Sequence, residues 1–228
     1  MSIYKKTSWE DIIMRLIDTY QQHVGDLLYK VRTTQRETIE KAAEIIAKAV
    51  EKGNHVYLDN ICHHIQHDVV DRGGGPTFYQ FYKPGETELK EGDVLFLSSV
   101  SGRTLSVVNL AYDCVEKGIN VIAFTSMEYA KAVDPVHPSG KKLYEIATIT
   151  MDNCAPAAEA MVEVEGIEAR FAAASGIASA FILWSITACV VEIMLADGYT
   201  PGILKSANYP GGRDYNQGLY DHYKEFGW

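Results

Sequence analysis

Hydrophobic residues recur at every third or fourth position over the first fifty residues of the chain. This spacing places apolar side chains on one face of a helix and predicts helices over 8–29 and 35–51. Gly53 follows directly and is suited to end the second helix, because glycine readily takes the left-handed backbone conformation. The pattern therefore predicts an N-terminal helical arm.

Short apolar runs replace this spacing in the middle of the chain. They predict five strands, at 55–59, 77–82, 94–99, 120–126 and the second half of 143–151. Helices are expected between and after them, over about 62–71, about 103–117 and roughly 175–196. Strands that alternate with helices favour a parallel sheet with right-handed crossovers. Proline and glycine make the tail irregular until about Tyr215.

One domain accounts for all of these elements. The chain has 228 residues, of which 47% are hydrophobic, and this is enough for one sizeable core. We expect residues 1–52 to form the helices of the arm, 53–198 the α/β core and 199–228 a tail. The sequence shows no repeat, low-complexity tract or linker that would divide the chain.

The stretch from 171 to 191 carries no charge and is long enough to span a bilayer. It is rich in Ala, Ser, Gly and Thr, and no basic flank biases its orientation. Small residues also let helices approach each other closely in a soluble core. We therefore favour a buried central helix or a dimer-interface helix over a membrane span.

The net charge of the chain argues against some classes of binding partner. The formal net charge of -9 argues against nucleic acid or an anionic membrane, since no basic stripe is present to neutralise phosphates. One phosphorylated small molecule is still compatible, because the N–H groups at a helix start can hold a phosphate. The four cysteines form no C-x-x-C pair and are typical of reduced thiols in a cytoplasmic protein. The first residues do not form a signal peptide, which also predicts a cytoplasmic location.

Residues 98–104, here called the serine turn, read Ser-Ser-Val-Ser-Gly-Arg-Thr and join the third strand to the next helix. Parallel sheets bind ligands outside the carboxyl ends of their strands, where this turn lies. Ser99 and Ser101 supply hydroxyl donors, and Gly102 lets the backbone approach a ligand closely. With the helix start, they can cradle an anion such as phosphate. The alternative is that the hydroxyls only cap the helix.

The serine turn and the segment after it resemble the sugar isomerase (SIS) domain family of phosphosugar binders. The matching residues are S-x-S-G-x-T and then G-I-N-V-I-A-F-T-S. Longer segments resemble a bacterial subgroup whose members are assigned as sugar isomerases or phosphoheptose isomerases, at 137–148, 152–160, 170–181 and 206–216. The resemblance implies a three-layer α/β sandwich with a five-stranded parallel sheet, flavodoxin-like, plus the helical arm.

The resemblance also implies that the partner is a sugar phosphate. Its phosphate would lie against the serine turn, on Ser98, Ser99, Ser101, Gly102 and Thr104. Other polar side chains on the same rim or on nearby loops are expected to contact the substrate, namely Thr125, Ser126, Ser139 and Ser175. Ser175 has the alternative of only capping the long helix.

The loop at 59–64 departs from the family, which usually has a glycine-rich turn there and here reads Asp-Asn-Ile-Cys-His-His. On the expected helix over 62–71, His64 and Asp68 are four residues apart and share a face. They resemble the His-x-x-x-Glu pair of the phosphoheptose isomerases, which bears on metal binding and proton transfer. Three interpretations stay open: a solvated polar face, acid–base catalysis, or a divalent metal such as zinc.

The metal interpretation lacks the further ligands that a metal site would need from the last helix. The partner ligands of the phosphoheptose isomerases lie on the last helix, and 175–196 contains neither His nor Gln. We therefore expect no metal and no other cofactor. His137 is the other candidate acid or base, or a residue that fixes its loop. Glu168 resembles a catalytic glutamate of the etherases related to this family, or belongs to a solvated acidic run with Glu159, Glu163 and Glu165.

These residues predict a cytoplasmic sugar-phosphate isomerase of the aldose–ketose type that moves protons with Asp68, His64 or His137. Two alternatives remain: a non-catalytic module that senses a phosphosugar, and an etherase-like phosphosugar lyase. The sequence shows no DNA-binding segment, so a transcriptional regulator is not supported. The first helix and the uncharged stretch have more apolar surface than one sheet face needs, so we expect a homodimer or homotetramer.

Overall fold

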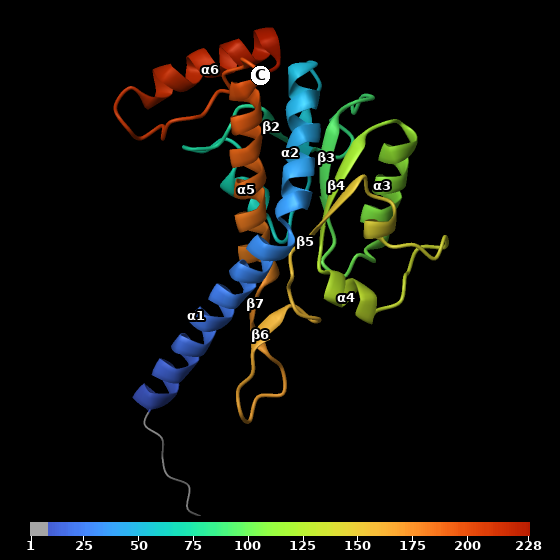
Figure 1. The fold of residues 1–228 in the computed structure, drawn as a ribbon, viewed down its shortest axis with the longest axis vertical. Helices are drawn as coiled ribbons and strands as arrows, with labels where there is room; N and C mark the ends of the chain where they lie inside the picture. Colours follow the sequence, from blue (N-terminus) through green and yellow to red (C-terminus); the bar gives the residue numbers. More distant parts are fainter. Residues whose placement is uncertain (1–8) are drawn as a thin grey trace, which may run out of the picture.

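The computed structural model describes residues 9–228, with side chains from Arg15 onward. Residues 1–8, which belong to the predicted helical arm, lie outside the described residues. Figure 1 shows a central sheet with helices on both faces, and one long helix that extends beyond the body.

The central sheet has five parallel strands in the order β2-β1-β3-β4-β5. The strands are β1 Val56–Leu58, β2 Tyr79–Phe81, β3 Val94–Ser98, β4 Asn120–Thr125 and β5 Ile149–Asp152. The first four lie within predicted strands and β5 ends one residue beyond its prediction, which confirms the parallel sheet. The chain proceeds outward from β1 to β2 on one side and from β3 to β5 on the other, so β1 and β3 flank the switch point. An open parallel sheet places its ligands at the carboxyl ends of such strands.

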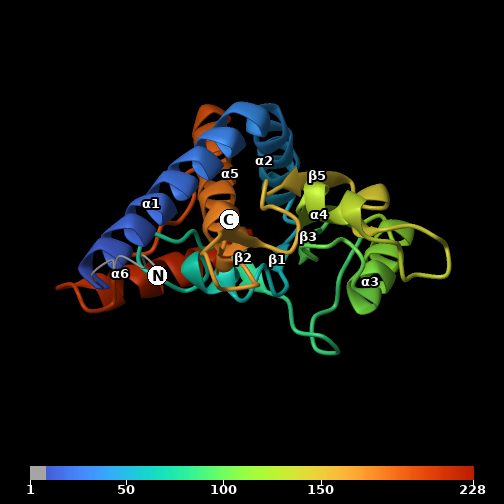
Figure 2. The same cartoon turned by 90° about the horizontal axis from the view of Figure 1, so that it is seen from below.

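Helices cover both faces of the sheet (Figures 1 and 2). On one face, α2 (Arg36–Glu51) and α5 (Ser175–Ala196) contribute Ile46 and Ile182 to the buried cluster that contains Phe96 and Phe124. On the other face, α3 (Leu105–Glu116) packs on the alternate side chains of the same strands. The central strands are buried on both faces, which explains their unbroken apolar runs. The predicted three-layer sandwich is confirmed.

The long uncharged stretch begins with β7 (Phe171–Ala173), and from Ser175 onward it lies in the central helix α5. By length and composition α5 is apolar enough to cross a membrane, but 44% of its most apolar window is buried inside the molecule. A core helix passes the same test, and Ile182 and Ile186 of α5 are fully buried. α5 is therefore a central helix with one buried side, and the alternative of a dimer-interface helix stays a prediction. All four cysteines are free thiols: three are buried, and Cys189 of α5 is half-buried.

The helical arm extends away from the sheet. Its helix α1 (Trp9–Thr34) lies beside a small antiparallel hairpin, as Figure 1 shows. The sequence pattern does not indicate this hairpin, which pairs β6 (Ala160–Val162) with β7 (Phe171–Ala173), or the short helix α4 (Met127–Ala132). The predicted helical turn before β5 is the 3-10 turn η2 (Leu143–Glu145). The last helix, α6 (Gly212–Phe226), lies at the far end of α5 and begins slightly before Tyr215.

The predicted helix over 62–71 is wrong. Cys62, His63 and His64 have left-handed backbone angles, with φ of 35°, 63° and 75°. Only the 3-10 turn η1 (Ile65–Asp68) follows them. A right-handed helix does not pass through three left-handed residues. His64 and Asp68 therefore do not share a helical face.

Two side chains replace the hydrogen bonds that this helix would have provided. Asn60 Oδ1 accepts from the His64 N–H at 2.9 Å. Gln66 Oε1 accepts from the Ile61 N–H at 3.0 Å. Local side-chain bonds of this kind compete with helix formation, and here they stabilise a folded loop after β1.

Candidate functional site

The serine turn lies at the carboxyl end of β3 and leads directly into α3. The Ser99 hydroxyl bonds to the Thr104 hydroxyl at 2.8 Å and accepts from the Thr104 N–H at 3.2 Å. Gly102 donates its N–H to the Ser99 carbonyl at 2.8 Å and has a φ of 68°, which favours glycine. A Cβ at Gly102 would lie 3.3 Å from the Ala130 Cβ. The turn is therefore compact, and its shape depends on this glycine.

The hydroxyls of the serine turn do not cap α3. Thr104 is the N-cap residue, and its side chain makes no cap hydrogen bond within the described part of the chain. Ser99 accepts from the N–H of Thr104 itself, so the next N–H groups of α3 point toward the turn. Ser101 is half-buried and Thr104 is exposed, which places both on the accessible side. This geometry favours an anion cradle over the capping alternative.

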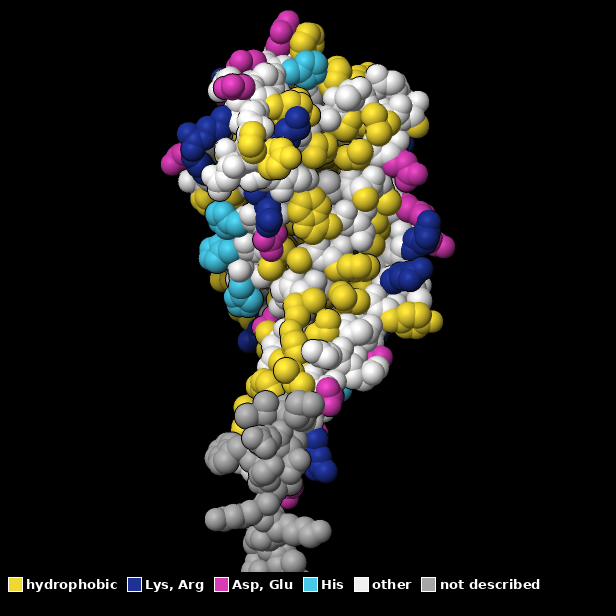
Figure 3. Space-filling view, turned by 90° about the vertical axis from the view of Figure 1, so that its left-hand side faces the viewer, with side chains coloured by type: hydrophobic (Ala, Val, Ile, Leu, Met, Phe, Trp, Pro, Cys, Tyr) yellow, Lys and Arg dark blue, Asp and Glu magenta, His cyan; other side chains and the backbone are white. Residues whose placement is uncertain are grey.

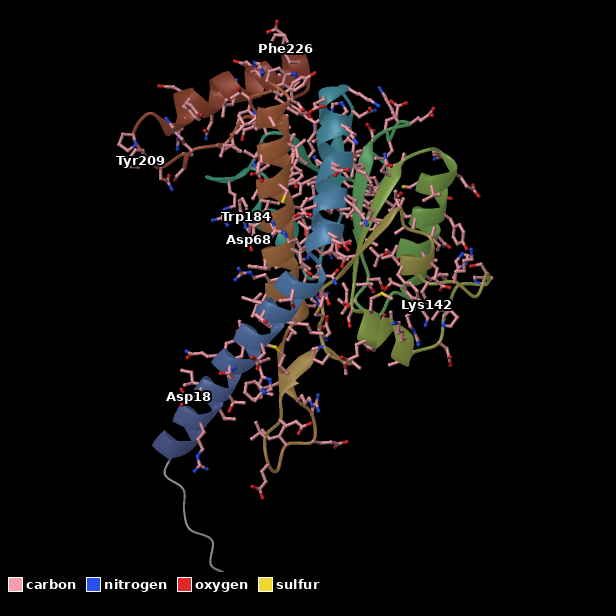
Figure 4. All side chains as sticks on the ribbon, in the orientation of Figure 1. Asp18, Asp68, Lys142, Trp184, Tyr209 and Phe226 are labelled. Atoms are coloured by element: carbon pink, nitrogen blue, oxygen red, sulfur yellow. The ribbon has the colours of Figure 1, made fainter. Side chains whose placement is uncertain are left out.

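A buried lysine lies behind the serine turn. Lys142 is 8% exposed, and its Nζ donates to the Ala130 carbonyl at 2.5 Å. The following residue, Leu143, donates its N–H to the Gly102 carbonyl at 2.8 Å. Figure 4 shows Lys142 on the α3 side of the sheet. Its ammonium adds positive charge behind the turn. The sequence does not predict this role for Lys142, because Lys141 beside it is also a lysine and no pattern shows which of the two is buried.

Thr125 and Ser126 lie underneath the turn. Both are fully buried. The Thr125 hydroxyl donates to the Ser99 carbonyl at 2.8 Å, and the Ser126 hydroxyl donates to the Ala155 carbonyl at 2.6 Å. Buried hydroxyls bonded to the backbone in this way hold the loops in place. The structure therefore gives these two side chains no exposed surface for the substrate contact that the sequence predicts.

Ser98 turns from the cradle toward the loop after β1. Its hydroxyl lies 3.1 Å from Cys62 Sγ and accepts from the Cys62 N–H at 3.3 Å. The same sulfur accepts from the Ser179 hydroxyl of α5 at 3.1 Å and from Asn153 Nδ2 at 3.8 Å. Burial raises the pKa of the Cys62 thiol, so the thiol is neutral at pH 7. Cys62 joins the ends of β1, β3 and β5 to α5.

Glu159 lies next to this cysteine network and not on a solvated face. Its Oε1 accepts from the Ser175 hydroxyl at 2.7 Å, and its Oε2 lies 3.8 Å from His63 Nε2. The side chain of Glu159 is 24% exposed, whereas Ser175 is fully buried. Ser175 therefore holds Glu159 and has no surface of its own for a substrate. Neither periodicity nor spacing could have linked Glu159 to His63, which is almost a hundred residues away in the chain.

Asp68 and His64 do not form the predicted pair. Asp68 Oδ1 lies 2.9 Å from Arg72 Nη1, and the His64 ring faces His67, with ring centroids 5.9 Å apart. Figure 4 shows Asp68 on the α5 side of the sheet, opposite the side of Lys142. Among the side chains that the structure describes, no group of three or more His, Cys, Asp or Glu could hold a metal ion. The absence of a cofactor stays a prediction.

His137 and Ser139 lie together on the flank of α3. His137 Nδ1 is 2.7 Å from the Ser139 hydroxyl, which also accepts from the Tyr112 hydroxyl at 2.9 Å. The His137 ring lies near the Tyr112 ring, with centroids 5.1 Å apart. Tyr112 is about two turns along α3 from the end that meets the serine turn. These contacts fix the loop, as one of the two interpretations expected. Glu168 is exposed in the loop between β6 and β7.

A protein-family model described as the SIS domain matches residues 80–126. This range includes β3, the serine turn, α3 and β4. These residues are therefore similar to an SIS domain. The phosphate-cradle candidate and the switch-point strand β3 both lie in the part that matches the family.

Similarity to other proteins extends over most of the chain. A UPF0309 protein from Shouchella clausii is 29% identical over 240 residues, which cover 92% of this chain and 98% of the relative. The phosphoheptose isomerase GmhA of Neisseria gonorrhoeae has a TM-score of 0.55 at 13% identity, covering 79% of this chain and 98% of that one. A protein of Listeria monocytogenes, assigned by inference as a sugar-phosphate isomerase, has a TM-score of 0.52 at 19% identity, covering 85% and 94%. At these identities the structural likeness is one of fold.

Proposed function

We propose that this protein binds a sugar phosphate, with the phosphate on the serine turn and the start of α3. The observation that supports this most is the geometry of the turn, in which Ser99 and Gly102 close the backbone and α3 presents its first N–H groups. Lys142 adds a buried positive charge behind the turn, in a chain whose net charge is -9. Backbone donors at a helix start hold phosphate without any exposed lysine.

We further propose that the protein is an isomerase of the aldose–ketose type. The shared fold with a phosphoheptose isomerase supports this reaction class. Such an isomerase needs a side chain that moves a proton between neighbouring carbons. The three predicted candidates each have a local partner: Asp68 is paired with Arg72, His137 is held by Ser139 and Tyr112, and His64 faces His67. None of the three has a contact with the serine turn among the described side-chain hydrogen bonds, so a further proton carrier is worth seeking.

A phosphosugar-binding module without turnover is the second candidate function. The loop after β1 favours it, because Cys62 bonds to three side chains around it and closes the space where the family usually has glycines. The lyase alternative has no comparable support, since Glu168 lies in an exposed loop.

We also propose that the protein acts in the cytoplasm as a homodimer or homotetramer. Figure 3 shows hydrophobic side chains running along the face that carries α5 and α6. Phe181 and Leu195 of α5 are 37% and 55% exposed, and Ile17 of the arm is 48% exposed. Light scattering should give a mass of two or four chains, and a single-chain mass would contradict the proposed assembly.

Thermal-shift measurements test the binding site. Pentose, hexose and heptose monophosphates should include at least one compound that raises the melting temperature, while the matching unphosphorylated sugars should not. The double variant Ser101→Ala with Thr104→Ala should lose the response, because both hydroxyls lie on the accessible side of the turn.

The matched control is Thr33→Ala, which removes an exposed hydroxyl bonded only within α1. This variant should keep the full response. If no sugar phosphate stabilises the unmodified protein, the proposed binding function is wrong.

A further inference from the structure

Glu159 is the carboxylate best placed to act on a sugar whose phosphate lies on the serine turn. It is next to Cys62, which bonds to Ser98, and Ser98 is the residue before Ser99 of the turn. Glu159 Oε2 lies 3.8 Å from Nε2 of His63, which belongs to the loop at the carboxyl end of β1, next to β3 in the sheet. A phosphosugar anchored at the turn would extend its carbon chain over the carboxyl edge of the sheet.

Ser175 and His63 lie beside the two carboxylate oxygens of Glu159, and a backbone hydrogen bond holds its main chain. The Ser175 hydroxyl donates to one carboxylate oxygen at 2.7 Å, and His63 Nε2 lies 3.8 Å from the other. The Glu159 carbonyl accepts from the Ala174 N–H at 2.9 Å. The residue keeps a left-handed backbone with φ of 70°, which side chains rarely adopt without surrounding constraint. A single well-held orientation is what a proton-transferring group requires.

Glu159 also lies where a proton-transferring carboxylate would be accessible. Its carboxylate lies at the start of α5, where it accepts from the Ser175 hydroxyl. Its side chain is 24% exposed, so it reaches both solvent and a ligand. The other acidic candidates lack this combination: Asp68 is paired with Arg72, Glu163 is paired with Arg170, and Glu168 is exposed in its loop.

We propose that Glu159 is the catalytic acid–base group of this site. The inference rests on the proposed aldose–ketose isomerisation and names the residue that performs it. The ionised carboxylate takes the proton from the carbon beside the carbonyl, and the electron pair of that C–H bond forms the carbon–carbon double bond of an enediol as the carbonyl oxygen gains a proton. The proton on the carbonyl oxygen comes from solvent. The protonated Glu159 side chain is 24% exposed, so its proton exchanges with solvent before Glu159 donates a proton to the former carbonyl carbon. The hydroxyl on the carbon that was deprotonated loses its proton to solvent and becomes the new carbonyl, so the sugar gains two protons and loses two.

Hydrogen exchange measures this step separately from binding. The protein is incubated in D₂O with the pentose, hexose and heptose monophosphates, and proton NMR follows loss of the signal from the carbon beside the carbonyl. The unmodified protein should exchange this proton and interconvert one aldose–ketose pair. Glu159→Gln should bind the same sugar phosphate with unchanged affinity but lose exchange and turnover at least about a hundredfold, the typical effect of removing a general base.

Two further variants keep the test decisive. Glu165→Gln changes an exposed carboxylate in the loop between β6 and β7 and should retain full exchange and turnover. Glu159→Asp keeps a carboxylate but shortens its reach, so it should bind normally with reduced exchange. This second variant provides the answer if Glu159→Gln does not fold.

The outcomes separate the inference from the function on which it rests. Sugar-phosphate binding without exchange in the unmodified protein would overturn the inference and leave a binding module. Exchange that persists in both Glu159 variants would overturn the inference and leave the isomerase. Loss of binding together with exchange would make Glu159 a ligand-binding residue, which also overturns it. If no sugar phosphate binds at all, the proposed function fails and the inference fails with it.

Discussion

At the scale of single residues, the loop after β1 holds three side chains in a conformation that glycine normally occupies. Cys62, His63 and His64 follow one another with positive φ angles. Each non-glycine residue in this region costs roughly 1–2 kcal/mol. The surrounding bonds from Asn60 and Gln66 must offset this strain. The loop thus carries the side chains of Cys62 and His63 on a backbone that glycine adopts more readily.

Replacing one of these residues by glycine should relieve part of the strain. His64 is exposed and has a φ of 75°. We expect His64→Gly to raise the free energy of unfolding by about 0.5–1 kcal/mol, because relief of the left-handed strain exceeds the added freedom of the unfolded chain. Glu165→Gly, in an exposed loop, should lower it instead. Urea unfolding measures the free energy of unfolding of both variants. If His64→Gly lowers it as much as Glu165→Gly does, the loop is not strained at His64.

Tyr223 makes stability depend on pH in the alkaline range. Burial raises its pKa from 10.0 to about 12, and its hydroxyl bonds to His55 Nδ1 at 3.0 Å and to Gln80 Nε2. Above pH 10 the unfolded chain loses this proton while the folded chain keeps it until about pH 12. The contribution to stability is therefore complete below pH 10 and is lost as pH rises toward 12.

Unfolding by urea at several pH values should show this loss. Tyr223→Phe should be less stable at neutral pH, because His55 and Gln80 lose their partner, but its stability should fall less steeply between pH 10 and 12. Tyr215→Phe, at an exposed position of α6, should keep the steep fall of the unmodified protein. An unchanged slope in Tyr223→Phe would show that another group controls this range.

Sequence reasoning identified the residues of the serine turn but not the residues around it. Ser99, Gly102 and Thr104 are neighbours in the chain, so their local pattern was enough. The pair of His64 and Asp68 was wrong because it depended on a helix that left-handed residues prevent. Glu159 and His63 come together only through the packing of the hairpin and α5 against the loop after β1, and no local pattern contains that information.

At the scale of elements, the serine turn and α3 act as one unit through Gly102. Its φ of 68° and the 3.3 Å between an added Cβ and Ala130 leave two separate obstacles to any larger residue. A turn that must bring its backbone close to an anion has the same requirement. The glycine therefore serves both the fold of the turn and access to its N–H groups.

A pair of alanine variants separates backbone strain from crowding. Gly102→Ala should lower the free energy of unfolding by more than the 1–2 kcal/mol or so expected for left-handed strain alone, and should weaken sugar-phosphate binding. Gly140→Ala has a similar φ of 72° but open space around the added Cβ, so it should show the strain alone and keep binding. Equal effects on stability and binding would contradict a role for Gly102 in the cradle.

Element length decided which elements the sequence could predict. α2, α3 and α5 have several turns of regular apolar spacing, and the pattern located them within a few residues. The strands β6 and β7 have three residues each, and β7 reads as the beginning of the uncharged stretch that becomes α5. A six-residue helix such as α4 carries too few apolar positions to establish a period.

At the scale of the whole molecule, α5 packs against the sheet with one side and forms part of the molecular surface with the other. Ile182 of α5 is fully buried in the main cluster, whereas Leu195 of the same helix is 55% exposed. Only one side of α5 packs against the sheet. Because the helix is apolar on nearly all sides, its other side leaves apolar side chains at the surface.

Truncation at these two positions should have different effects on the unfolding of the whole chain. Ile182→Ala leaves a cavity between α5 and the sheet and should lower the free energy of unfolding by about 2–5 kcal/mol. Leu195→Ala should change it by no more than about 0.5 kcal/mol. Chemical denaturation followed by circular dichroism gives both values, and similar losses at the two sites would mean that the outer side of α5 is also covered.

The same helix provides a natural position for chemical labelling. Cys62, Cys114 and Cys154 are buried, and Cys189 of α5 is the most accessible of the four thiols. Burial and the nearby Glu192 raise the pKa of Cys189, so a maleimide dye will react faster at mildly alkaline pH. A fluorophore attached there would report directly on whatever covers this side of α5, without removal of any other cysteine.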